Sequence, residues 1–81
     1  MQQEQPTREF TFGEQLVGLN FNPSNDPRVD RVKQVCAELA DLIKSEMTPS
    51  ASTLKRMLME QAIAEILDAQ MYAVKVLTFK N

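Results

Sequence analysis

Residues 18–33 contain the groups in this sequence that are best suited to binding a ligand. The segment combines one aromatic ring, four short hydrogen-bonding side chains and three basic residues: Phe21; Asn20, Asn22, Ser24 and Asn25; and Arg28, Arg31 and Lys33. It leads into the expected start of a helix, where free N–H groups and a positive partial charge favour an anion. Phe21 offers a flat face on which a planar base can stack.

The same residues also fit an ordinary capped turn whose Phe21 plugs the open end of a helical pair. The spacing from Gly18 to Asn22 and Pro23 matches no phosphate-binding loop motif. The residue types alone therefore leave a ligand site and a structural turn as alternatives.

Residues suited to catalysis are few. The sequence has no histidine, and its single cysteine is Cys36, so histidine-dependent triads, disulfide frameworks and common zinc sites are excluded. Glu60, Glu65 and Asp68 are spaced like carboxylates on the surface of a helix. Cys36 falls on an apolar helix face, which favours a small buried hydrophobe over a nucleophile. We expect a protein that is not an enzyme and uses no metal or cofactor.

Length and composition limit the fold and the partners. The 81 residues suffice for one domain, residues 1–81, with 43% hydrophobic and 25% charged residues. A net charge of −2 argues against a broad DNA-binding surface, which needs an excess of Lys and Arg. The sequence has no run of about 18 apolar residues, so no membrane-spanning helix is predicted. The first residues do not resemble a signal peptide.

The pattern of apolar and capping residues predicts an all-α fold, an antiparallel two-helix hairpin. Asp26 and Pro27 are typical of a helix start, and apolar spacing continues to Met47, so helix one is expected over residues 26–47. Pro49 is expected to stop it. A second segment over residues 48–79, capped by Thr48 or a following serine, contains a helix from about residue 51 to residue 78.

Residues 1–25 are expected to form an N-terminal arm and turn, with a short extended piece at residues 8–12 and a dense turn at residues 20–27. No helix is predicted in this arm.

Apolar residues of the second helix nearly encircle its axis from residue 62 onward. A partner helix covers one side only, so the pattern predicts a homo-oligomer with these helices in its core. The alternative is that residues 8–25 fold back over the second side. A polar stripe remains, which fits a solvated face better than a ligand-facing wall: Gln61, Glu65, Asp68, Tyr72 and Lys75.

Three stretches resemble a family of small phage proteins built on a two-helix hairpin, the anti-CBASS sponges and, more distantly, the anti-Thoeris sponges. They are Gly18-Leu-Asn-Phe-Asn-Pro-Ser24, Val29-Asp-Arg-Val-Lys33, and Asp68-Ala-Gln-Met-Tyr-Ala-Val-Lys-Val-Leu-Thr-Phe79. The resemblance implies a compact homohexamer in the cytoplasm of an infected bacterium. The resemblance also implies that the protein binds cyclic dinucleotides between protomers and sequesters them without cleavage. Some members of the family also bind cyclic trinucleotides at separate sites.

The resemblance also implies roles for individual residues. Lys33 would contact a phosphate, and Phe21 would stack on a base where the family often has tyrosine. Arg56, early in helix two, would serve a trinucleotide site, and Ser24 and Arg28 are weaker candidates from the turn. The alternative function is an oligomeric helical-hairpin module that binds a protein partner and no nucleotide. An enzyme that degrades the messenger is the least favoured hypothesis.

Overall fold

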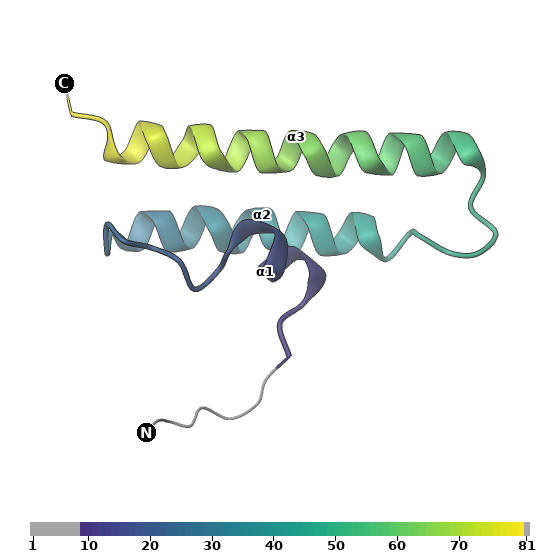
Figure 1. The fold of residues 1–81 in the computed structure, drawn as a ribbon, viewed down its shortest axis with the longest axis horizontal. Coiled ribbons are helices and arrows are strands. Elements are labelled where there is room, and N and C mark those ends of the chain that lie inside the picture. The colour runs from purple at the N-terminus through teal and green to yellow at the C-terminus, as the bar shows by residue number, and fades with distance from the viewer. Residues whose placement is uncertain (1–8, 81) are drawn as a thin grey trace.

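A computed structural model describes residues 9–80, which form helices α1 (Phe12–Val17), α2 (Pro27–Lys44) and α3 (Thr53–Thr78). No strand occurs among these residues, and the all-α prediction is confirmed for them. Figure 1 shows α2 and α3 side by side, joined at one end by residues 45–52. The short helix α1 packs against α2.

Helix α2 begins where the sequence predicts. The carboxylate of Asp26 accepts a hydrogen bond from the backbone N–H of Arg28 at 2.8 Å, and Pro27 is the first helical residue. Proline fits this position because its missing N–H would have no partner inside the helix. The preceding turn is therefore fixed against the first turn of α2.

Helix α2 ends earlier than predicted, at Lys44 instead of Met47. The backbone N–H of Met47 bonds to the carbonyl of Lys44 at 2.9 Å, three residues back, which is the geometry of a tight turn and not of an α-helix. Pro49 lies in the connection after this turn. The expectation that this proline stops the helix is wrong, since the chain has already left the helix.

Helix α3 begins at Thr53, slightly later than the predicted start near Ala51. Of the capping residues considered, Ser52 takes the role, because its hydroxyl accepts a hydrogen bond from the N–H of Lys55 at 3.1 Å. Thr48 lies in the connection instead. The predicted end at Thr78 is confirmed.

Helix α1 was not predicted; an extended piece was expected at residues 8–12, of which residue 8 lies outside the described residues. Thr11 and Glu14 form a reciprocal capping box that starts the helix at Phe12. The Thr11 hydroxyl accepts from the Glu14 N–H at 3.1 Å, and the Glu14 carboxylate accepts from the Thr11 N–H at 2.9 Å. Gly18 ends the helix in the left-handed conformation, with φ of 64°.

Close approach of the two backbones attaches α1 to α2. A Cβ atom added to Gly13 would lie 2.0 Å from the carbonyl oxygen of Ala37, so only glycine fits. The N–H of Gly13 donates to the Asp41 carboxylate at 2.6 Å. Ala37 and Asp41 are one turn apart on α2, and together they form the surface on which α1 rests.

The core is small because the helices form a layer whose shortest dimension is 13 Å. Only six apolar residues are buried among those described: Val17, Val29, Ala37, Ala40, Met59 and Ile66. Large apolar side chains remain exposed on α2 (Val35, Leu39 and Leu42) and on α3 (Leu54, Met57, Leu58, Met71, Tyr72 and Val76). Residues 9–25 do not cover these side chains, since α1 packs chiefly on α2.

Replacing Gly13 with alanine is expected to destabilise the protein by about 1–3 kcal/mol, because the added methyl group overlaps the backbone of Ala37. Urea unfolding followed by circular dichroism measures the change. Gln15→Ala is the matched control on α1, since the Gln15 side chain is exposed and makes one hydrogen bond, to the Phe10 carbonyl at 3.0 Å. Equal stability of the two variants would show that α1 does not rest on α2.

Candidate ligand-binding site

A pocket of about 440 Å³ lies between the turn before α2, the first turns of α2 and the C-terminal half of α3. Its volume falls within the range of about 300–1,000 Å³ that is usual for small-ligand sites. Ten residues line it: Phe21, Asn22, Pro23, Ser24, Val29, Lys33, Gln70, Met71, Val74 and Thr78. Three of the site residues named from the sequence, Phe21, Ser24 and Lys33, therefore meet at one pocket.

Lys33 is the charged group of this pocket, and it is 95% buried, with 5% of its surface exposed. Its ammonium group donates to the carbonyls of Gly18, at 3.0 Å, and of Phe21. It also lies 5.4 Å from the centre of the Phe21 ring. No carboxylate within the described residues forms an ion pair with it. The positive charge is thus held in place but not neutralised.

Phe21 presents its ring to solvent at the edge of the pocket, with 70% of its surface exposed. Its backbone is fixed on both sides, because its carbonyl accepts from Lys33 and its N–H donates to the carbonyl of Gly18 at 2.9 Å. The side chain itself is open to a partner. An exposed aromatic ring on a fixed backbone is suited to stacking on a flat ligand.

Ser24 belongs to the hydrogen-bond network of the turn. Its hydroxyl donates to the side chain of Asn22 at 2.6 Å and accepts from the N–H of Asp26 at 3.1 Å. The Asn22 amide donates in turn to the Asp30 carboxylate and to the Asp26 carbonyl, both at 3.0 Å. These contacts make the turn rigid, with Asn25 in the left-handed conformation at φ of 57°.

Arg28 does not line the pocket. Its guanidinium pairs with the Asp26 carboxylate at 2.7 Å and donates to the carbonyl of Leu77 at 3.2 Å, which ties the start of α2 to the end of α3. The hydrogen bond between the two side chains raises the pKa of Arg28 and lowers the pKa of Asp26. Arg28 is exposed beside the turn, and the Asp26 carboxylate balances its charge.

Arg56 lies in the first turn of α3. Figure 1 shows that α3 begins at the connection from α2, at the end of the helical pair opposite the C-terminus of α3. Its guanidinium donates to the carbonyls of Ala51, at 3.3 Å, and Thr48, at 3.2 Å. Within one chain it is therefore not brought together with Phe21, Ser24 or Lys33. Its predicted role at a second site stays a prediction.

Gln70 is a pocket residue that sequence analysis missed. It is 93% buried, with 7% of its surface exposed, and it follows Ile66 by one turn on the buried face of α3. The signal that could have found it is a polar residue interrupting an apolar stripe at helical spacing. None of the hydrogen bonds among residues 9–80 involves its side chain.

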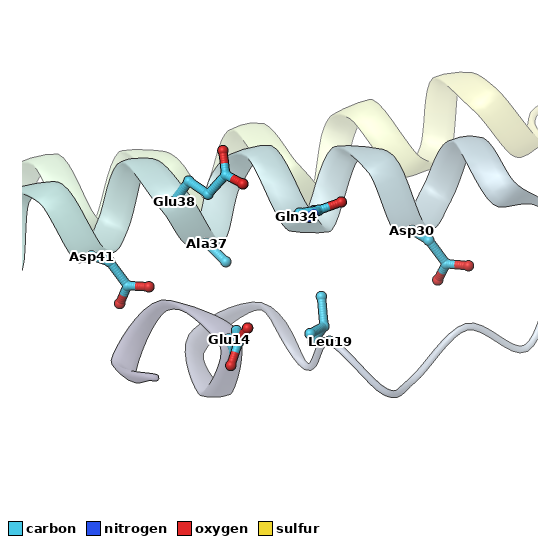
Figure 2. Close-up of a pocket in the computed structure, with 7 residues that line it drawn as sticks. All are labelled: Glu14, Leu19, Asp30, Gln34, Ala37, Glu38 and Asp41. Carbon is cyan, nitrogen blue, oxygen red and sulfur yellow. The ribbon is translucent and has the colours of Figure 1, made fainter. Parts of the chain in front are cut away.

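A second groove, of about 340 Å³, lies between α1 and α2 and has the opposite charge. Figure 2 shows Asp30 and Asp41 at its two ends, Leu19 pointing toward α2 from the segment after α1, and Glu38 pointing away from α1. Glu14 also lines it, and no basic residue does. An anionic ligand is repelled here and attracted to the pocket of Lys33.

The polar stripe of α3 is exposed, as the sequence predicts for a solvated face. Its internal contact is a hydrogen bond from Gln61 to Glu65 at 2.9 Å. No three acidic or cysteine side chains among the described residues lie close enough to hold a metal ion. None of the helices in residues 9–80 has the length and apolar character needed to cross a membrane.

Searches of protein-family models, curated proteins and solved structures give no match for this chain.

Cys36 is partly buried on α2, and burial raises the pKa of its thiol. Because the thiolate is the reactive form, alkylation by iodoacetamide at pH 7.5 is expected to be slower than for glutathione. A thiol-quench assay measures both rates, and the same protein unfolded in urea provides the control with an exposed thiol. A folded rate equal to or above that of glutathione would identify Cys36 as an activated nucleophile.

Proposed function

We propose that this protein is a non-enzymatic sponge that binds cyclic oligonucleotide second messengers and thereby blocks bacterial anti-phage signalling. Cyclic dinucleotides are the first ligand class, and cyclic trinucleotides are the second. The observation that carries the proposal is the buried ammonium group of Lys33, which lines a pocket without a carboxylate partner.

A buried charge is costly unless an opposite charge or several hydrogen bonds compensate it. The carbonyls of Gly18 and Phe21 use two of the three ammonium hydrogens of Lys33. A phosphate oxygen would supply both the remaining acceptor and the missing negative charge. The pocket therefore favours an anionic ligand although the whole chain carries a net charge of −2.

Phe21 extends this preference to a ligand that is both anionic and flat. The ammonium group of Lys33 lies over this ring, 5.4 Å from its centre, so a base can stack on the exposed part of the ring while a neighbouring phosphate meets the charge. Cyclic oligonucleotides carry these two features at a fixed separation, because the ring restrains phosphate and base together. The resemblance to the phage sponges points to the same ligand class.

Sequestration needs affinity and abundance but no reactive group, which suits a chain without histidine. The proposal places the protein in the cytoplasm of the infected bacterium, where the messengers are made. The helical hairpin is proposed to assemble into a homo-oligomer, a hexamer by resemblance. Support comes from the thin layer of helices and from the apolar side chains exposed on both α2 and α3.

Native mass spectrometry with cyclic di-AMP, cyclic GMP–AMP, cyclic di-UMP and cyclic tri-AMP tests ligand uptake and assembly together. The expected result is an oligomer that carries intact cyclic nucleotides, recovered unchanged after denaturation. Cleaved nucleotides would indicate an enzyme. No uptake at micromolar ligand would refute the sponge function.

Phe21→Ala is expected to weaken cyclic-nucleotide binding by about five- to 150-fold, because base–aromatic stacking contributes about 1–3 kcal/mol. The melting temperature of the free protein should stay nearly the same, since the Phe21 side chain is 70% exposed. Titration calorimetry and a thermal melt measure the two quantities. Phe21→Tyr keeps the ring and should keep the affinity.

Phe79→Ala is the matched control, because Phe79 is an aromatic residue of similar exposure, 65%, that does not line the pocket. The affinity of the Phe79→Ala variant for cyclic nucleotides should equal that of the unaltered protein. Equal affinities for Phe21→Ala and Phe79→Ala would remove Phe21 from the binding site.

The alternative function is an oligomeric helical module that binds a protein partner and no nucleotide. The observation that favours it is the exposed methionine surface of α3, where Met57 and Met71 are 60% and 59% exposed. Methionine suits adaptable protein-binding surfaces. Met59, which lies between them in the sequence of α3, is buried and does not contribute. A bare oligomer or monomer that binds none of the four nucleotides would favour this function.

Val76→Glu is expected to split the proposed oligomer into smaller species. Val76 is 73% exposed in the single chain, so the substitution should not affect the folding of a protomer, but it would place a charge inside an apolar interface. Sedimentation velocity measures the mass. Ser50→Glu adds the same charge in the exposed connection after α2 and should leave the mass unaltered. Equal masses for the Val76→Glu variant and the unaltered protein would exclude this face of α3 from the assembly.

A further inference from the structure

The side-chain amide of Gln70 is the one polar group of the Lys33 pocket that has no hydrogen-bond partner among residues 9–80. It is 93% buried, with 7% of its surface exposed. The other polar side chains of the pocket are engaged: Asn22 and Ser24 in the turn, Lys33 with two carbonyls, and the Thr78 hydroxyl with the Val74 carbonyl at 2.8 Å. Buried polar groups normally have partners, so this amide needs an explanation.

Packing alone does not explain a glutamine at this position. Its neighbours on the pocket wall include Val29, Met71 and Val74, whose side chains offer no hydrogen bond. An apolar residue of the same length would fill the same space without burying an unpaired amide. A local feature that lowers stability at a pocket wall is the pattern expected of a functional residue.

We propose that Gln70 reads the edge of a nucleobase in this pocket, an inference that rests on the proposed function. A carboxamide presents one donor group beside one acceptor, and nucleobase edges present the complementary pair. Adenine, with its N6 amino group beside N7, is an established partner of glutamine. A phosphate offers acceptors only, and it would leave the carbonyl oxygen of the amide unpaired.

Each of the three pocket residues would then recognise a different part of one nucleotide. The charge of Lys33 meets a phosphate, the ring of Phe21 covers the face of a base, and the amide of Gln70 contacts the edge of a base. Because Gln70 comes from α3 and the other two from the turn and α2, a ligand would bridge the two halves of the fold. Charge and stacking tolerate any base, so Gln70 is the residue that sets base preference.

The test is Gln70→Met, which keeps the length of the side chain and removes the amide. Affinity for the tightest ligand among cyclic di-AMP, cyclic GMP–AMP, cyclic di-UMP and cyclic tri-AMP should fall about five- to 150-fold, as expected for loss of a bidentate base contact. The melting temperature of the free protein should rise or stay equal, because an unpaired buried amide is removed. A purely structural role of Gln70 would lower it.

Gln61→Met on the exposed face of the same helix is the matched control, and it should leave ligand affinity unaltered. If the unaltered protein binds none of the four nucleotides, the proposed function fails, and this inference fails with it. If it binds but Gln70→Met binds equally well, only the role of Gln70 is refuted. A lower melting temperature for Gln70→Met would also refute it, since the amide would then have a structural partner in the assembly.

A second measurement needs no substitution and so does not depend on the folding of a variant. Nitrogen-15 NMR of the unaltered protein follows the side-chain amide signals of Gln70 and Gln61 during titration with the tightest of the four nucleotides. The Gln70 signals should move and the Gln61 signals should stay. Equal responses of the two amides would refute base reading by Gln70.

Discussion

The hydrogen bonds from Lys33 to the carbonyls of Gly18 and Phe21 determine the geometry on which the pocket depends. They attach the segment between α1 and α2 to the second turn of α2. The backbone position of Phe21 and the wall that this turn gives to the pocket depend on this attachment. Without the ammonium group, two carbonyls of the turn would lose their shared donor, and the aromatic ring would lose its fixed backbone.

The charge distribution shows why net charge says little about the ligand. The chain carries a net charge of −2, yet its carboxylates and its buried ammonium group lie in different recesses. The groove between α1 and α2 contains Glu14, Asp30, Glu38 and Asp41, while the pocket beside α3 contains Lys33 and no carboxylate. A small anion responds to the nearest charges, because salt screens those beyond about 10 Å. A negative protein can therefore bind a negative ligand at one place.

The sequence predicted those elements that depend on neighbouring residues. Asp26 and Pro27 start α2 because a cap and a fixed φ act within one turn, and Ser52 was among the caps considered for α3. Phe21 and Lys33 meet because a turn that precedes a helix lies beside its first turns. What the sequence did not reveal depends on contacts distant along the chain.

Helix α1 depends on such a contact, because six residues with a glycine at the second position are helical only when they rest on α2. Arg56 and Gln70 are further examples. Nothing local to Arg56 shows that it lies at the opposite end of α3 from the pocket, or that its guanidinium is engaged by the connection. In the sequence, Gln70 is one polar residue of a helix, and nothing distinguishes it until the burial of its face is known. Both positions were defined by how α3 packs, which periodicity does not fix.

Met71 belongs both to the Lys33 pocket and to the exposed outer side of α3. This residue lines the Lys33 pocket and also the shallow recess formed with Asp68, Tyr72 and Lys75 on the outer side of α3. It is 59% exposed, so a second chain placed on the apolar side chains of α3 would contact the same side chain that borders the pocket. In the proposed assembly, Met71 would therefore contact both the ligand and a neighbouring subunit. A partner chain would cover the open side of a site that one 13 Å layer of helices leaves exposed.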